Sequence, residues 1–304
     1  MNAAPRPSGS PSLGDAIGAT WTTFWFTPVG AWPLAAVRIG GGLLALALWA
    51  GYARDLETWF GASGMIPPGL LAAWRSPYGV SVFDFLPSSP LLWIAYLAGG
   101  LVLACVTVGA LTPVTTVLGA LAFASLLHRG PMLAGPADDV VAVILWCLAI
   151  GRSGDALSID GGARSRLGRP SPAPSVRSRI ALGLLRIHAA VIAGAAALAQ
   201  LKGDVWWNGT AAWWLAARAD SGLVDLTGLF LRSEYLLNVV THAIVLFEAL
   251  FAAGMWIPAV RRPLAIAGLV AWPLIGIVGG EPFWGFALAV LSLGCLPDAV
   301  ESSA

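Results

Sequence analysis

The chain has 304 residues, of which 58% are hydrophobic and only 11% are charged. Soluble domains carry about 25% charged residues, so a water-soluble core is a poor account of so much apolar length. The formal net charge of +1 gives no basis for nucleic-acid binding. Composition therefore predicts an all-α integral membrane protein whose main partner is the lipid bilayer.

Cysteine and arginine usage narrows the class further. Cys105, Cys147 and Cys295 lie singly in different apolar runs, with no CxxC and no Cys/His cluster, so neither a metal site nor a disulfide framework is predicted. Arginine supplies all of the 17 Lys and Arg residues except Lys202. This bias is typical of GC-rich bacterial genomes and favours a bacterial inner membrane.

The chain begins with a polar stretch. Residues 1–12 are rich in Pro and Ser, without a charged segment leading into an apolar core, so we expect a disordered tail and not a signal peptide. Residues 14–30 carry several aromatic side chains and are predicted to form an amphipathic helix in the membrane interface. One transmembrane domain is predicted over 13–299, followed by a short tail at 300–304.

About eight apolar segments follow, each near the ~20 residues that a helix needs to cross a bilayer. They cover residues 32–51, 90–110, 113–131, 138–152, 180–201, 236–257, 263–279 and 283–297. The fourth and the eighth are short, which leaves seven or nine spans as alternatives. The predicted fold is a polytopic bundle of about eight transmembrane helices.

Positive charge predicts the orientation of this bundle. The loop 152–179 carries Arg152, Arg164, Arg166, Arg169, Arg177 and Arg179, and a second basic connection carries Arg261 and Arg262. Because basic loops stay in the cytoplasm, both termini are expected there in a multi-pass cell-membrane protein. The long loops 52–89 and 202–235 then share the outer face.

Charged side chains inside the predicted spans need an explanation, because each costs about 2.5–3.5 kcal/mol at the bilayer centre. Arg38, in the first span, either binds an anion or acidic partner, pairs structurally with a carboxylate, or extends toward the near interface. Glu248, in the sixth, is a candidate proton carrier or a partner of Arg38 or Arg186.

Two polar pairs flank the connection between the third and fourth segments. His128 and Arg129 suit an interfacial anchor, and Asp138 and Asp139 suit the first turn of a helix, where carboxylates complement the helix dipole. The alternative is that the basic and acidic pairs face each other and enclose a polar pocket at the membrane surface.

Several stretches, in order along residues 13–299, resemble the horizontally transferred transmembrane (HTTM) family, a relative of the vitamin K-dependent γ-carboxylase. The matching segments are RIGGGLL from Arg38, DLETWFGASGMIPP from Asp55, LLHRG ending at Gly130, GPADDVV from Gly135, ALSID from Ala156 and QLKGDVWWNGTAAWW from Gln200. Glu248 falls where the family has a glutamate late in the following span.

The resemblance implies a membrane enzyme that binds a reduced quinone and modifies an exported peptide or small protein. The candidate catalytic residues are Lys202 as a displaced base, Glu248 as a proton carrier and His128 as an electrostatic stabiliser. The candidate cofactor-binding residues are Arg38, Arg129 and Trp206.

Two departures from the carboxylase pattern leave a second function open. Gln200 occupies the position of the lysine that acts as the base, and Lys202 lies about 200° further around a helix. The chain also ends soon after the eighth segment, without room for the carboxylase's lumenal domain. The alternative is a non-enzymatic, immunity-type membrane protein that binds a partner through Trp206, Trp207, Trp213 and Trp214.

Overall fold

The computed structural model describes residues 12–61, 63–66, 71, 79–86, 88–218 and 224–296, and these ranges contain helices and no strand. The predicted tails at 1–12 and 300–304 lie almost wholly outside the described residues. The longer helices are α1 (Leu13–Phe26), α2 (Trp32–Gly51), α5 (Ser89–Val108), α6 (Thr112–Arg129), α7 (Pro136–Ile150), α9 (Val176–Gln200), α13 (Glu234–Gly254), α14 (Pro258–Val278) and α15 (Pro282–Gly294). Short elements connect them: α3 (Leu56–Phe60), α8 (Ile159–Arg166), α10 (Asp204–Trp207), α11 (Ala211–Ala216), α12 (Thr227–Arg232) and the 3₁₀ turns Tyr52–Asp55, Val82–Phe85 and Ser153–Asp155.

All eight predicted apolar segments contain a helix, but the count of about eight spans is not confirmed. Among the residues that the structure describes, five helices are long and apolar enough to cross a membrane: Trp32–Phe60, Ser89–Val108, Val176–Gln200, Glu234–Gly254 and Pro258–Val278. With 15 and 13 residues, α7 and α15 are only about 22 and 20 Å long, against a hydrocarbon core of about 30 Å. Helix α6 has 18 residues, but its last two are His128 and Arg129, which lower its apolar content.

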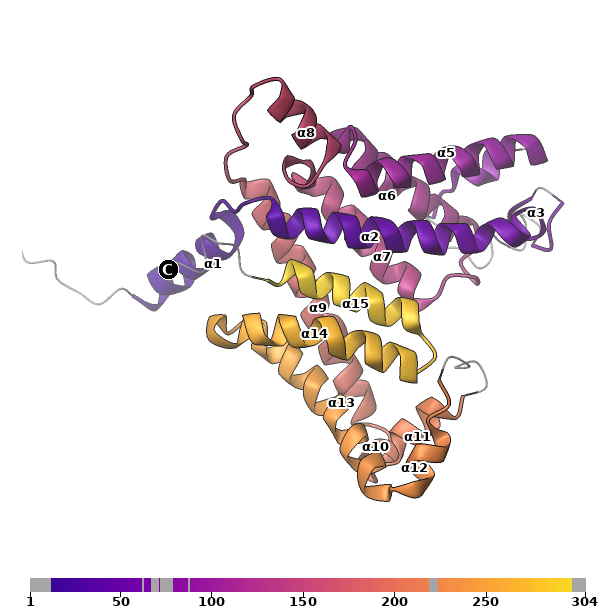
Figure 1. Cartoon of the computed structure of the whole chain (residues 1–304), viewed down its shortest axis with the longest axis vertical. Helices are drawn as coiled ribbons and strands as arrows, with labels where there is room; N and C mark the ends of the chain where they lie inside the picture. Colours follow the sequence, from indigo (N-terminus) through magenta and orange to yellow (C-terminus); the bar gives the residue numbers. More distant parts are fainter. Residues whose placement is uncertain are drawn as a thin grey trace, which may run out of the picture.

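Helices α2, α5, α6 and α7 form one part of the bundle, and α13, α14 and α15 form another, with α9 crossing between them (Figure 1). The tightest pair is the α14–α15 hairpin. A Cβ atom added to Gly276 would lie 2.8 Å from the Cα of Gly285, so only glycine permits this approach. Small residues at crossing points are the usual means of packing helices in a membrane.

The connections separate into two groups at opposite ends of the helices. Figure 1 shows α8 and the α13–α14 turn at the left, and α3 with α10–α12 at the right. The arginine-rich loop 152–179 and the Arg261–Arg262 pair therefore belong to one end, and the described parts of loops 52–89 and 202–235 belong to the other. This arrangement agrees with the grouping that the positive charges predicted.

The predicted interfacial segment forms helix α1, and none of its residues is buried. Arg179 holds its C-terminal end, because Nε donates to the Phe24 carbonyl oxygen at 2.7 Å and Nη2 donates to that of Thr23 at 3.2 Å. A backbone bridge between Val29 and Ser175 fixes the chain just after it. Helix α1 is thus attached at the basic end of the bundle, with Trp21 and Leu13 exposed.

Gly109 ends α5 in a left-handed conformation, with φ +74°, and a Cβ there would lie 2.4 Å from the Cβ of Ser158. We expect Gly109→Ala to lower the unfolding free energy by roughly 3 kcal/mol, because backbone strain of about 1–2 kcal/mol adds to the clash. Gly168→Ala is the matched control, since Gly168 has φ +64° with no atom within 4 Å of an added Cβ. Equal midpoints of the two variants in thermal unfolding would show that Ser158 does not approach Gly109 this closely.

Candidate functional site

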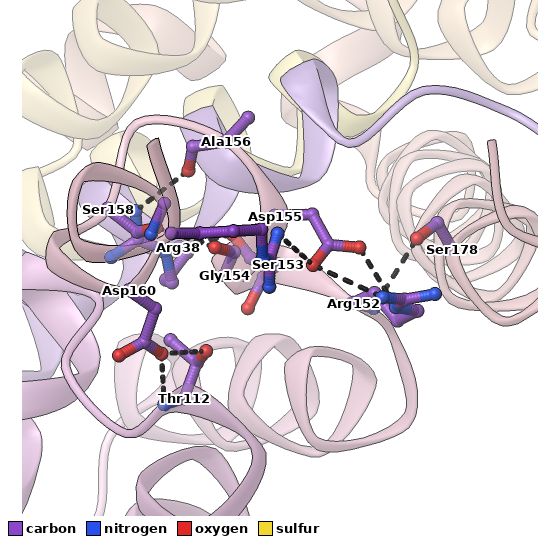
Figure 2. A network of polar contacts seen from close by, with 12 residues as sticks. Arg38, Thr112, Arg152, Ser153, Gly154, Asp155, Ala156, Ser158, Asp160 and Ser178 are labelled. Carbon is purple, nitrogen blue, oxygen red and sulfur yellow. Dashed lines mark hydrogen bonds and ion pairs between the residues drawn. The ribbon is translucent and has the colours of Figure 1, made fainter. Parts of the chain in front are cut away.

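Arg38 is fully buried and binds backbone carbonyl groups rather than a carboxylate (Figure 2). Nη1 donates to the Val106 and Thr107 carbonyl oxygens at 2.9 and 2.7 Å, and so closes the C-terminal turn of α5. The remaining nitrogens reach the loop that follows α7: Nε donates to Ser153 at 3.2 Å, and Nη2 donates to Leu157 at 2.6 Å and Ala156 at 3.5 Å. The guanidinium thus has a structural role, joining two segments far apart in sequence, but its partners are carbonyl groups and not the predicted carboxylate. Binding of a ligand by Arg38 stays a prediction.

Asp160 lies beside this network and receives hydrogen bonds from the start of α6 (Figure 2). The Leu111 and Thr112 amides donate to its carboxylate at 2.8 Å each, and the Thr112 hydroxyl donates at 2.6 Å. Partial burial acts to raise the pKa of Asp160, but these hydrogen bonds and the positive charge of Arg164 hold it below its ordinary value. Asp160 therefore caps a helix that precedes it by almost fifty residues, which explains the ALSID segment structurally.

Because Asp160 caps α6 through its ionised carboxylate, the unfolding free energy should depend on pH. The contribution of Asp160 is present above the pKa of the unfolded chain and is lost as the pH falls through the lower pKa of the folded state. We expect Asp160→Asn to lower the unfolding free energy at pH 7 by about 1 kcal/mol, the usual cost of weakening a helix cap. Unfolding curves of the two proteins should converge at acidic pH; a difference that persists there would rule out the carboxylate charge as its cause.

His128 and Arg129 point to separate partners at the end of α6. His128 is exposed, with Nδ1 3.1 Å from the Val80 carbonyl oxygen. Arg129 is buried, lies 3.7 Å from an Asp84 carboxylate oxygen and donates to the Gly61 carbonyl oxygen at 3.2 Å.

Asp138, from the acidic pair of the same connection, accepts hydrogen bonds at the start of α7. The Gly135 amide donates to Asp138 at 2.8 Å at the first turn of α7, and the Tyr52 hydroxyl donates to it at 3.1 Å. The helix-start interpretation of Asp138 is confirmed. These contacts do not form the predicted polar pocket between the basic and acidic pairs, because Arg129 pairs with Asp84 and not with Asp138.

Lys202 is exposed in the turn after α9. Helix α9 ends at Gln200, so the turn does separate Lys202 from the helical register. However, Lys202 is not among the residues that line the cavity beside Glu248. Its assignment as the displaced base stays a prediction, and one that requires the exposed ammonium group to turn inward.

Glu248 is 1% exposed in the middle of α13 and lines a cavity of about 160 Å³. Within the described residues, neither carboxylate oxygen has a hydrogen bond of ordinary geometry, although the side-chain amide of Gln200 lies close enough to interact with it. Among the described residues, no salt bridge includes Glu248. Of its two predicted partners, Arg38 donates to carbonyl groups, and the guanidinium carbon of Arg186 lies 5.7 Å from the centroid of the Phe24 ring. With Gln200 as its one neighbouring donor in the described part of the chain, the buried carboxylate has hydrogen-bonding capacity to spare, which is costly and points to a ligand.

The residues around this carboxylate come from six helices and their connections. We name the site the Glu248 cavity; it is lined by Gln200, Trp206, Leu215, Arg218, Ile244, Glu248, Ile275, Gly276, Gly279, Glu281 and Trp284. Two tryptophans, the buried acceptor oxygens of Glu248 and Gln200 and a polar rim suit a small, flat molecule with a hydroxyl donor. A cavity of about 150 Å³ holds a single six-membered ring, so the size fits one ring and not two.

The structure thus brings together two of the six predicted site residues, Glu248 and Trp206. Arg38, His128, Arg129 and Lys202 do not line this cavity. Sequence reasoning named Gln200 only as a departure from a pattern, and it missed Trp284 and Glu281. Glu281 directly precedes α15 and Trp284 lies in the first turn of that helix, and this acidic and aromatic pair was the available signal.

No family model, curated protein or solved structure matches the chain. Among the described residues, no group of three or more His, Cys, Asp and Glu side chains is placed to hold a metal ion. The HTTM resemblance stays a prediction from the sequence motifs, and the Glu248 cavity is the feature of this helical, membrane-type chain on which a function can be built.

Proposed function

We propose that the protein is a multi-pass membrane protein that binds a single-ring, quinol-type molecule in the Glu248 cavity. The observation that carries the proposal is the buried Glu248 carboxylate, which faces this cavity without a hydrogen-bond donor of ordinary geometry among the described residues. An ionised carboxylate only accepts hydrogen bonds, so its ligand has to donate one. A hydroquinone hydroxyl provides that donor, and Trp206 and Trp284 provide faces for the ring.

In this proposal, Glu248 accepts the hydroxyl proton of the bound ring, and Gln200 orients the carboxylate. That assigns Glu248 the role of proton acceptor without any need for Lys202. The step is a proton transfer from oxygen to oxygen, for which the two groups need to lie within hydrogen-bond reach. The HTTM resemblance supports a quinol as the ligand, since the carboxylase relative acts on a reduced quinone.

The orientation follows from the positive charges. Loop 152–179 and the Arg261–Arg262 pair lie at one end of the helices, which the positive-inside rule assigns to the cytoplasm. The Glu248 cavity is lined in part by residues of α10, α11 and the α14–α15 turn, elements that lie toward the other end. The cavity then opens toward the outer face of a bacterial inner membrane, where an exported peptide is the substrate that a carboxylase-like protein would modify.

Binding of hydroquinone and of benzoquinone to the purified protein at pH 8 tests the proposal. The two rings match in size, but only the reduced one carries donors. We expect the reduced ring to bind roughly tenfold or more tightly, because sites built around a hydrogen bond discriminate strongly against ligands that lack it. Glu248→Gln should remove this preference, whereas Glu281→Gln, at the rim of the same cavity, should keep it. Equal affinity for both rings in the wild-type protein would refute the role of Glu248.

The alternative of a partner-binding protein rests on exposed tryptophans. Trp207 and Trp214 are 66% and 58% exposed in the connection between α9 and α13. Tryptophan belts at membrane interfaces have the same exposure, so these two residues favour a partner less specifically than the Glu248 cavity favours a ligand. Capture of one defined secreted protein by the wild type, lost in a Trp207→Ala/Trp214→Ala variant with unchanged hydroquinone affinity, would favour this alternative.

A further inference from the structure

A second and larger cavity lies at the opposite end of the helices, outside the proposed quinol site. It has a volume of about 410 Å³, within the ordinary range for ligand pockets. It forms where α6 begins, α7 ends and α9 begins, with α8 as its outer wall. We name it the basic pocket; its lining is Leu111, Thr112, Pro113, Thr116, Ala149, Gly151, Arg152, Ser153, Gly154, Asp155, Asp160, Arg164 and Arg177.

The charges in the basic pocket do not cancel. Arg152 and Arg164 share the one carboxylate of Asp155, with Arg152 Nε 2.9 Å from Oδ2 and Arg164 Nη1 3.3 Å from Oδ1 (Figure 2). The Asp160 carboxylate is directed at the backbone of α6 through the Leu111 and Thr112 amides. Two guanidinium groups thus face one available carboxylate, and their side chains are still 45% and 28% exposed.

Two further donors line the same cavity. Arg177 is exposed, and its Nε donates to the Ile150 carbonyl oxygen at 3.0 Å at the end of α7. Ser153 is only 1% exposed, yet its hydroxyl has no hydrogen-bond partner among the described residues. Buried hydroxyl groups are nearly always paired, so this one indicates a missing acceptor inside the pocket.

We propose that the basic pocket binds a phosphate group. Guanidinium groups recognise phosphate oxygens through paired, charge-assisted hydrogen bonds, and the Ser153 hydroxyl supplies a neutral donor to the same anion. The phosphate has two possible sources, an anionic phospholipid headgroup and free phosphate in the cytoplasm. Basic pockets between membrane helices on the cytoplasmic side are suited to headgroups, and this pocket is lined by Arg177 of α9, the helix that the interfacial helix α1 contacts.

The experiment uses the full chain after exchange of its lipids into zwitterionic detergent. One arm measures retention of phosphatidylglycerol against phosphatidylcholine by native mass spectrometry, and the other measures the shift in unfolding temperature with inorganic phosphate. Arg164→Gln and Arg177→Gln remove lining charges, and Ser153→Ala removes only the buried hydroxyl. Arg166→Gln is the matched control, because Arg166 lies on the same helix α8 and loses the same charge outside the pocket lining.

We expect each lining-arginine variant to bind about fivefold more weakly, the loss typical of one basic residue at an anionic membrane surface. Wild type and Arg166→Gln should bind alike. Selective retention of phosphatidylglycerol would assign the site to a headgroup, and stabilisation by inorganic phosphate without lipid selectivity would assign it to the free anion. Equal losses in Arg164→Gln and Arg166→Gln, or no binding of either phosphate in the wild type, would overturn the proposal. Hydroquinone affinity should be unchanged in all four variants, so this result is separable from that of the Glu248 cavity.

Discussion

Replacing Arg38 with methionine is expected to lower the unfolding free energy by roughly 4 kcal/mol or more. The side chain is fully buried, and its nitrogens donate to carbonyl groups of Val106, Thr107, Ser153, Ala156 and Leu157. Each buried carbonyl left without a donor costs about 1–3 kcal/mol, and several are left at once. Methionine keeps most of the volume, so loss of packing contributes little. Chemical or thermal unfolding in detergent micelles measures the change.

Arg38→Lys separates charge from geometry. Lysine keeps the positive charge but has one nitrogen in place of a planar fork, so we expect it to recover less than half of the lost stability. Arg166→Gln serves as the exposed control and should unfold with the wild-type midpoint. Full rescue by lysine, or a loss below about 1 kcal/mol for methionine, would mean that the five carbonyl contacts do not hold the α5–α6 corner together.

Glu248→Gln is expected to act in the opposite direction and raise the unfolding free energy by about 1–2 kcal/mol. The carboxylate is buried, and within the described residues neither oxygen has an ordinary hydrogen bond, which is a cost of about this size. A glutamine at the same position can both donate to and accept from the adjacent Gln200 amide. Residues that serve activity commonly lower the unfolding free energy in this way.

Glu281→Gln is the control for this substitution. Glu281 lines the same cavity but is exposed, so its neutralisation should leave the unfolding midpoint unchanged. Saturating hydroquinone should stabilise the wild type and not Glu248→Gln, because only the wild type offers an unpaired acceptor. A Glu248→Gln protein that is less stable than the wild type would show that the carboxylate is already well paired.

Composition predicted the class of fold because a surplus of apolar residues has one common physical use, contact with lipid. Counting apolar runs did not predict how many helices are long enough to cross a bilayer. The run at 138–152 begins with two aspartates that serve the first turn of α7, and the helix ends at Ile150. The run at 283–297 forms a helix that stops at Gly294. A hydrophobic run measures apolar content and not helix length, so the prediction of about eight spans exceeds the five candidate spans.

The candidate site was only partly predictable for a different reason. Helical periodicity relates residues on one helix, and Glu248, Trp206 and Trp284 come from three separate helices. Their proximity depends on how α10, α13 and α15 are placed relative to one another, which sequence spacing does not encode. Glu248 could be named because a carboxylate inside a span is costly, and that argument needs no knowledge of its neighbours.

Arg38 shows the limit of the same argument. Its cost inside a span was correctly identified, but the expected partner was a carboxylate or an anionic ligand. The partners are backbone carbonyl groups at a helix end and in a loop more than a hundred residues away. Every residue carries a carbonyl group, so no pattern of side chains could have marked these acceptors.

Photo-cross-linking with a single-ring hydroquinone that carries a diazirine tests the central claim most directly. The labelled peptides are mapped by mass spectrometry, with and without excess unlabelled hydroquinone. The Glu248 cavity predicts competed labelling of α10 around Trp206, of α13 around Ile244 and Glu248, and of the start of α15 around Trp284. Competed labelling at the end of α6 around His128 instead, or labelling that excess hydroquinone does not reduce, would contradict it.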